Sequence, residues 1–153
     1  FLAERLGQLK LKADGRLRVT YQDPCRLGRH LGVYDPPRQV LRSLPGLEVV
    51  EMRRSGAAAV CCAGGTWSHC DRFAKRIQVE RLREARATGA QVLAAACPKC
   101  QIHLRCAMKD PHLGREIEME TRDIAELVDA ALGGQTSRSD TPLGVSGKAR
   151  PND

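Results

Sequence analysis

Cysteine is the residue type in this sequence that could do the most distinctive chemistry. The 153 residues contain seven cysteines, including the adjacent pair Cys61-Cys62 and the motif Cys97-Pro98-Lys99-Cys100. Thiolates select zinc, copper(I) or iron–sulfur centres, and a C-x-x-C motif supplies two ligands with chelate geometry. An odd number of cysteines in a chain this long does not fit a secreted disulfide framework. We therefore interpret them as reduced thiols or metal ligands of a cytoplasmic protein.

The segments before these cysteines are expected to bring them together. A strand-like run at 18–22 stops just before Cys25, the small apolar run 57–60 leads into the cysteine pair, and a buried strand is expected at 91–96. The carboxyl ends of parallel strands share one edge of an open α/β sheet, and ligands bind at that edge. We expect five sulfurs there, from Cys25, Cys61, Cys62, Cys97 and Cys100.

The remaining elements predict an α/β fold. Strands are also expected at 47–52 and 117–119, and helices at 1–11, 36–44, 71–87, 102–108 and 123–132. Strands that alternate with helices indicate βαβ units, and hence a small parallel-sheet domain with helices on both faces. We divide the chain into an N-terminal helix and linker (1–15), a cysteine-rich domain (16–132) and a disordered tail (133–153).

Composition and missing motifs exclude several function classes. The formal charge of +7 could attract nucleic acid, but only five residues are aromatic, too few for a base-stacking surface, and the compact C-x-x-C…C-x-x-C spacing is absent. The sequence has no apolar run of the roughly 18 residues that a membrane helix needs. It also has no G-x-G-x-x-G after a strand, and therefore lacks the fingerprint of a flavin or nicotinamide site.

The cysteine spacing resembles a known family. Five sulfurs exceed the four that a structural zinc takes and suit a centre with several irons. Thirty-five residues separate Cys25 from Cys61, and thirty-four separate Cys62 from Cys97. This pattern, together with the run from Asp23 to Arg29 and the Ala63-Gly64-Gly65 turn, resembles the cysteine-rich CCG domain of the B-type and D-type subunits of heterodisulfide reductase. The resemblance covers residues 18–132, with Ala63 in place of the motif's glycine.

The resemblance implies a cofactor and a function. In the B-type subunit of heterodisulfide reductase each such motif holds a noncubane [4Fe-4S] cluster on five cysteines, so it implies that Cys25, Cys61, Cys62, Cys97 and Cys100 ligate one here. The expected protein is a subunit or domain of a multi-subunit oxidoreductase that transfers electrons and reduces a disulfide substrate, with a flavin- or ferredoxin-type electron donor as partner. Family members usually carry two motifs, whereas this chain carries one.

Other interpretations of the same residues stay open. A single zinc on the site would make the domain a structural or assembly module of a redox complex, buried cysteines can be simple packing residues, and a lone C-x-x-C can be a redox dithiol. Cys70 and Cys106 lie outside the pattern and are left out of the site. Several neighbours could influence the centre through charge, hydrogen bonds or shielding, but each has an equally ordinary surface or core role: Arg26, Trp67, His69, Lys99 and His103.

Overall fold

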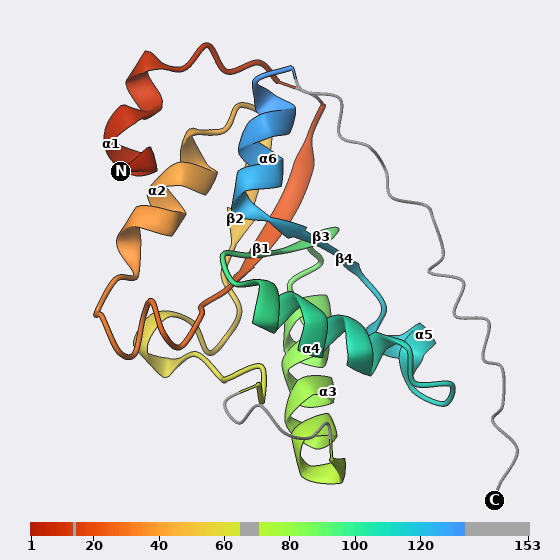
Figure 1. Ribbon diagram of the computed structural model, residues 1–153. Helices are drawn as coiled ribbons and strands as arrows, with labels where there is room; N and C mark the ends of the chain where they lie inside the picture. The colour runs from red at the N-terminus through yellow and green to blue at the C-terminus, as the bar shows by residue number, and fades with distance from the viewer. Residues whose placement is uncertain (14, 65–70, 134–153) are drawn as a thin grey trace, which may run out of the picture.

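A parallel sheet of four strands organises the chain. The structure, a computed structural model, describes residues 1–13, 15–64 and 71–133. The strands lie in the order β2-β1-β3-β4, and every neighbouring pair is parallel (Figure 1). Their bounds are β1 Leu17–Gln22, β2 Leu47–Val50, β3 Val92–Ala95 and β4 Glu120–Asp123. The chain direction across the sheet reverses between β1 and β3, which makes this the topological switch point.

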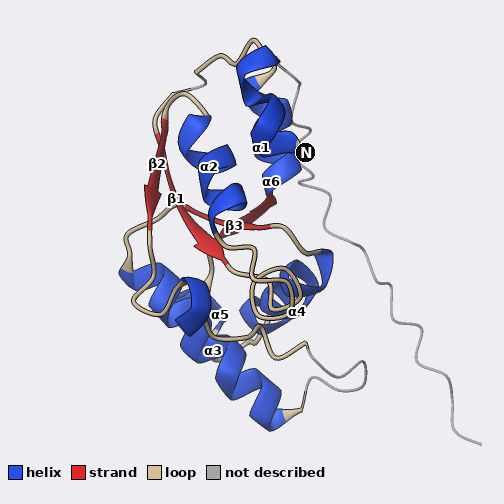
Figure 2. Cartoon of the chain, turned by 90° about the vertical axis from the view of Figure 1, so that its left-hand side faces the viewer, coloured by secondary structure: helices blue, strands red, loops and turns tan. Residues whose placement is uncertain are grey.

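Helices cover both faces of the sheet. One face is covered by α2 (Asp35–Ser43), α6 (Ile124–Ala131) and the N-terminal α1 (Leu2–Arg5), and the other by α3 (Arg72–Ala87), α4 (Pro98–Met108) and α5 (Gly114–Ile117). Figure 2 shows these two helix layers on either side of the strands. The predicted parallel α/β fold is therefore confirmed.

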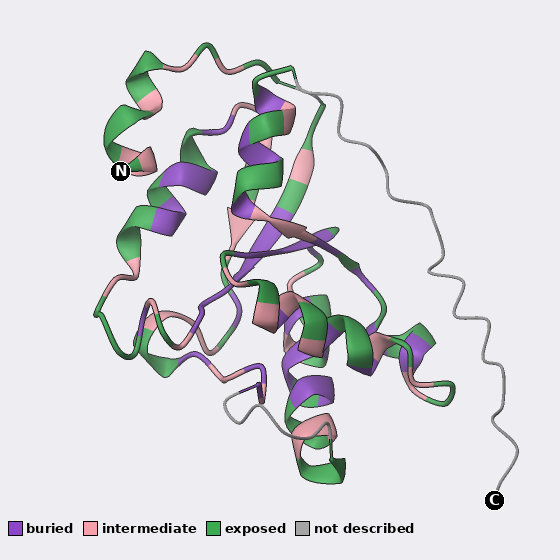
Figure 3. Cartoon of the chain, viewed as in Figure 1, coloured by how far each residue is buried: buried purple, intermediate pink, exposed green. Residues whose placement is uncertain are grey.

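Side chains of β3 point alternately to the two faces of the sheet, as they must along a strand, and so contribute to the hydrophobic core on each face. Val92 and Ala94 belong to the core under α2 and α6, whereas Leu93 and Ala95 belong to the core under α3 and α4. All four residues are buried (Figure 3), which explains why this central strand is a continuous apolar run without a polar face.

The N-terminal segment docks on the α2 and α6 side, but not as one helix. α1 gives way to a 3₁₀ turn at Leu6–Gln8 and then to extended chain, so the predicted helix at 1–11 is wrong in form. The apolar side chains of this segment pack against the core beneath α2 and α6. Its end is fixed by the Lys12 N–H, which donates to the Ala131 carbonyl at 2.7 Å.

Two other predicted elements are shifted. The strand expected at 117–119 is wrong, because Ile117 ends α5 and the strand runs from Glu120 to Asp123 instead. The helix expected from Ile102 begins at Pro98, so Cys100 lies in its first turn. The helix expected at 123–132 is α6; Asp123, at its start, is the N-cap, and Glu126 completes a capping box. Of the predicted tail, only Gly133 lies within the described residues.

No helix among the residues that the structure describes combines the length and apolarity needed to cross a bilayer.

Candidate metal centre

Three chain segments bring the five predicted cysteines to the carboxyl edge of the sheet. Cys25 lies three residues after the last residue of β1, and Cys97 lies two residues after β3 as the N-cap of α4. Cys100 is in the first turn of α4. The expectation that the pair Cys61-Cys62 follows closely on a strand formed by the apolar run 57–60 is wrong: that run includes part of the 3₁₀ turn Gly56–Ala58, and ten residues separate the pair from β2.

The thiols of four of these cysteines form a hydrogen-bonded row. Cys61 hydrogen-bonds to Cys25 and to Cys62, and Cys62 hydrogen-bonds to Cys100. Cys62 and Cys100 are buried, whereas Cys25, Cys61 and Cys97 are partly exposed. Cys97 packs against the same core as Cys61, Cys62 and Cys100. The row therefore starts in the core and ends at the surface.

The cysteines are gathered but are not yet oriented as the ligands of one ion. Within 1–13, 15–64 and 71–133, no group of three or more Cys, His, Asp or Glu side chains could hold a metal ion as it stands. The thiols instead hydrogen-bond to one another, and each of these hydrogen bonds needs a proton on one of its two sulfurs. Metal binding would release those protons, because the ligand is the thiolate.

Mutual contact and burial make these protons hard to remove. The hydrogen bond with Cys62, followed by burial, raises the pKa of the Cys61 thiol far above its usual value. The hydrogen bond with Cys100, together with burial, raises the pKa of Cys62 to about 11. The backbone N–H groups of Ala63 and Gly64 act in the opposite direction by donating to the sulfurs of Cys61 and Cys62. The loop thus already supplies donors for the deprotonated sulfurs.

The donors depend on an unusual backbone conformation at Ala63. Its φ of 58° lies in the left-handed region, which only glycine adopts freely. This is the position where the motif of the resembled family has glycine. Ala63 therefore adopts the left-handed conformation that a glycine would adopt freely at this position. For a residue with a Cβ, this conformation costs roughly 1–2 kcal/mol.

A buried ion pair holds the Cys25 loop against the loop that leads to the cysteine pair. Arg38 of α2 donates to both carboxylate oxygens of Asp23, at 2.7 and 2.9 Å, and to both oxygens of Glu51, at 2.8 and 2.9 Å. Asp23 also accepts the N–H of Gly56 at 2.9 Å. Asp23 precedes Cys25 by two residues, and Gly56 begins the 3₁₀ turn before Cys61. The network therefore fixes the spacing between two of the cysteine segments.

A second buried network supports the same two loops from α3. Arg81 is fully buried and donates from Nε to Oε1 of Gln22 at 2.6 Å. The amide nitrogen of Gln22 in turn donates to the carbonyls of Asp23 and Val60, at 3.2 and 3.1 Å. Because Val60 directly precedes Cys61, α3 positions the cysteine pair through one intermediate side chain.

The sequence alone does not identify these supporting residues as functional. Asp23 is noticeable in the sequence only as a member of the run around Cys25, without a role of its own. The Asp23 and Glu51 partners of Arg38 and the Gln22 partner of Arg81 lie 13 to 59 residues away along the chain, so no local pattern could reveal these contacts. The local signal that was available is Pro98 directly after Cys97, since proline at the first helical position predicts that α4 begins there.

The other candidate residues from the sequence differ in their exposure and in their position relative to the row of thiols. Cys106 is exposed on α4, where Lys75 Nζ lies 3.6 Å from its sulfur, and it takes no part in the row of thiols described above. Arg26 is exposed and Lys99 is partly buried. His103 lies one turn after Cys100 and close to Gly64. Trp67, His69 and Cys70 lie outside the described residues.

The donor set fits a thiophilic centre. The side chains gathered at this edge are thiols, which select zinc, copper(I) or iron–sulfur clusters over hard cations. The α4 N-terminus, with Cys97 as N-cap and Cys100 in the first turn, adds the positive end of a helix dipole. This helix N-terminus stabilises the negative charge that a set of thiolates would bring.

Several known proteins are similar to this chain in sequence. It is 39% identical over 140 residues to the D-type subunit of dihydromethanophenazine:CoB–CoM heterodisulfide reductase of Methanosarcina mazei, an alignment that covers 89% of this chain and 33% of that protein. It is 42% identical over 128 residues to a probable membrane-anchored ferredoxin of Chromohalobacter salexigens (82% and 18%). It is 36% identical over 133 residues to the B-type subunit of the fumarate reductase (CoM/CoB) of Methanothermobacter marburgensis (86% and 26%).

The match is to one part of these larger proteins. The chain spans about a third of the heterodisulfide reductase subunits. No solved structure matches it significantly. The family profile described as CCG, cysteine-rich domain, matches residues 19–105, which include Cys25, Cys61, Cys62, Cys97 and Cys100. This chain belongs to the CCG family of cysteine-rich domains.

Proposed function

We propose that this domain binds a noncubane [4Fe-4S] cluster and transfers electrons as part of a heterodisulfide-reductase-like oxidoreductase. The observation that carries the proposal is the row of thiols from Cys25 through Cys61 and Cys62 to Cys100, drawn from three separate segments. Relatives are named as heterodisulfide reductase subunits and as an iron–sulfur-binding oxidoreductase. The proposed ligands are Cys25, Cys61, Cys62, Cys97 and Cys100.

The chain's own residues would bind the centre and keep it accessible from one side. Cys62 and Cys100 anchor it in the core, while the partly exposed Cys25, Cys61 and Cys97 leave a path to the surface. The Ala63 and Gly64 N–H groups donate to the sulfurs of Cys61 and Cys62. When bound, an iron–sulfur cluster supplies one-electron chemistry.

The partners and substrate follow from the relatives and are part of the proposal. We expect a disulfide substrate and a flavin- or ferredoxin-type protein that delivers electrons, because the relatives include heterodisulfide reductase subunits and an EtfAB:quinone oxidoreductase. We expect the domain to be cytoplasmic and to bind no nucleic acid.

Metal analysis of an anaerobic preparation tests the proposal. We expect equal amounts of iron and acid-labile sulfide, close to four of each per chain, and a visible absorption band that disappears on reduction. Cys61→Ser should abolish the iron content, and Cys106→Ser, which changes an exposed cysteine on the same helix as Cys100, should leave it unchanged. A colourless protein without iron would refute the proposal.

A structural zinc site is the second candidate, and one observation favours it. The hydrogen-bonded row consists of four thiols, which is the number of ligands that a structural zinc takes. Cys97 separates the two candidates. If zinc binds the row, Cys97→Ser should keep one zinc per chain, whereas a cluster held by five cysteines should lose its iron in the same variant.

A further inference from the structure

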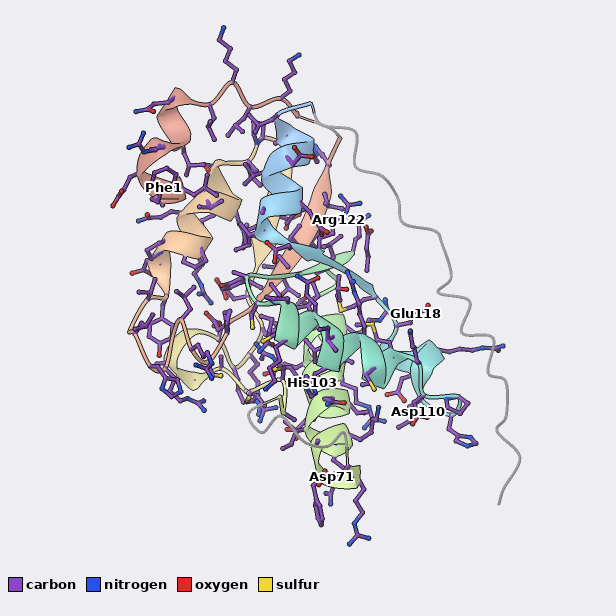
Figure 4. The ribbon with its side chains drawn as sticks, viewed as in Figure 1. Phe1, Asp71, His103, Asp110, Glu118 and Arg122 are labelled. Carbon is purple, nitrogen blue, oxygen red and sulfur yellow. The ribbon has the colours of Figure 1, made fainter. Side chains whose placement is uncertain are left out.

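His103 lies where it can contact the proposed centre from the side of α4. It follows Cys100 by three residues, so both side chains lie on the same side of the helix, one turn apart. Figure 4 shows His103 on α4 where this helix meets α3. The side chain is partly buried, which separates it from the exposed His30 and His112.

A fully buried glutamine of α3 fixes one edge of the imidazole. Nε2 of Gln78 lies 3.4 Å from Nδ1 of His103, and the Gln78 side chain is 0% exposed. The amide nitrogen is a donor, so Nδ1 accepts this hydrogen bond. A neutral imidazole whose Nδ1 is an acceptor carries its proton on Nε2.

The protonated edge faces the loop that carries the cysteine pair. A Cβ atom placed on Gly64 would lie 2.9 Å from Cδ2 and 3.2 Å from Nε2 of His103, and 3.3 Å from Sγ of Cys62. The Nε2 atom of His103 and the Cys62 sulfur therefore border the same small space, which exists because residue 64 has no side chain. Cys62 and its row partner Cys100 are both buried beside it.

We infer that His103 donates a hydrogen bond from Nε2 to the sulfurs of the centre bound at Cys62 and Cys100, and thereby raises its reduction potential. This inference rests on the proposed function. A hydrogen bond to a cluster sulfur disperses negative charge and stabilises the reduced state more than the oxidised state. His103 is a tuning and positioning residue in this role, and Gln78 acts through it by selecting the tautomer.

A redox titration of the anaerobically purified full chain tests this role. His103→Leu removes the donor and should shift the ratio of reduced to oxidised centre at a fixed potential at least tenfold toward the oxidised form. Tenfold corresponds to about 59 mV for a one-electron couple. His103→Gln keeps an N–H near the Nε2 position, so its reduction potential should return most of the way to the wild-type value. His112→Leu, at an exposed histidine outside the site, is the matched control.

Two results would overturn the inference. One is a potential for His103→Leu that equals that of His112→Leu while both variants retain full iron and sulfide. The other is a reduction potential for His103→Gln that is shifted as far from the wild-type value as that of His103→Leu. That result would indicate that packing, and not a hydrogen bond, has been lost. Iron and sulfide measured on every variant show whether the centre itself has been lost.

A second measurement does not need the cluster and so separates this inference from the proposed function. Nitrogen-15 NMR of the metal-free, reduced protein at pH 8 should show His103 as the Nε2–H tautomer, and Gln78→Leu should reduce its population. A protein that binds no iron refutes the proposed function. An Nδ1–H tautomer in the wild-type protein refutes the role of His103, whatever the metal content.

Discussion

Replacing Arg38 by methionine should destabilise the domain far more than the same change one turn later at Arg42. Both arginines lie on α2 and both pair with Glu51, but their surroundings differ. Arg38 is 6% exposed and makes two hydrogen bonds to Asp23, which is 5% exposed. Arg42 is largely exposed and lies 3.8 Å from Glu51.

The magnitude follows from what each change leaves behind. Arg38→Met leaves the Asp23 carboxylate buried, with the Gly56 N–H as its remaining hydrogen-bond donor among the described residues. Removing one partner of a buried ion pair costs roughly 3–5 kcal/mol, because the other charge stays unpaired. An exposed pair contributes roughly 0–1 kcal/mol. From the difference between these two costs, we expect the free energies of unfolding of the two variants to differ by about 3 kcal/mol.

Urea denaturation of the metal-free protein, followed by circular dichroism, measures the difference. At an m-value of roughly 1.5 kcal/mol/M, about 3 kcal/mol lowers the midpoint by about 2 M. If Arg38→Met alone is too unstable to purify, the double variant Asp23→Asn with Arg38→Met removes the unpaired charge and should recover most of the loss. The reasoning is refuted if Arg38→Met and Arg42→Met unfold within about 1 kcal/mol of each other, a threshold set by the exposed-pair estimate.

Three further changes test the cysteine loop. Ala63→Gly should stabilise the protein by about 1 kcal/mol in urea denaturation, because Ala63 has a positive φ; a loss of stability would contradict this. Gly64→Ala should cost roughly 1–3 kcal/mol by overpacking against His103, whereas Gly7→Ala, in open space, should be nearly neutral. The metal-free protein should lose stability as the pH rises from about 9 to about 11, because the pKa values of Cys61 and Cys62 are both raised, that of Cys62 to about 11, and the unfolded thiols ionise first. Denaturation series at pH 7, 9, 10 and 11 should show this decline, and Cys62→Ala should flatten it.

The parts of the fold that carry local signals were predictable. The buried run from Val92 to Ala95 is a central strand, and an apolar stretch followed by C-x-x-C identifies it. The sequence also predicts Asp123 as the cap of the last helix, and its carboxylate accepts the Ala125 N–H at 2.9 Å. Strand ends then predict the positions of Cys25 and Cys97, because a parallel sheet collects its carboxyl ends at one edge.

The misplaced strand shows where a local pattern misleads. Ile117 and Met119 are buried and alternate as strand residues do, yet Ile117 ends α5 and Met119 lies in the connection that follows. The true strand, Glu120–Asp123, pairs only with β3 at the edge of the sheet. An edge strand with one buried row can consist of charged residues, so its sequence carries little hydrophobic signal.

The buried arginines that hold the cysteine loops in place could not be predicted from the sequence, for a different reason. Buried charged residues such as Arg38 and Arg81 look like surface residues until their partners are known. Asp23 and Gln22, which receive their hydrogen bonds, belong to a different part of the chain. A basic residue on a helix such as the one predicted at 71–87 would ordinarily face solvent, but Arg81 is completely buried.

The hydrogen bond between Lys12 and Ala131 has a consequence for how such a domain can be combined with others. The chain enters the folded domain before β1 and leaves it after α6 at neighbouring points, on the end of the molecule away from the cysteine loops (Figure 1). A unit whose entry and exit adjoin can be inserted into a longer chain without distorting either part. Proteins several times the length of this chain can therefore carry the domain as a module, with its cysteine edge still facing outward.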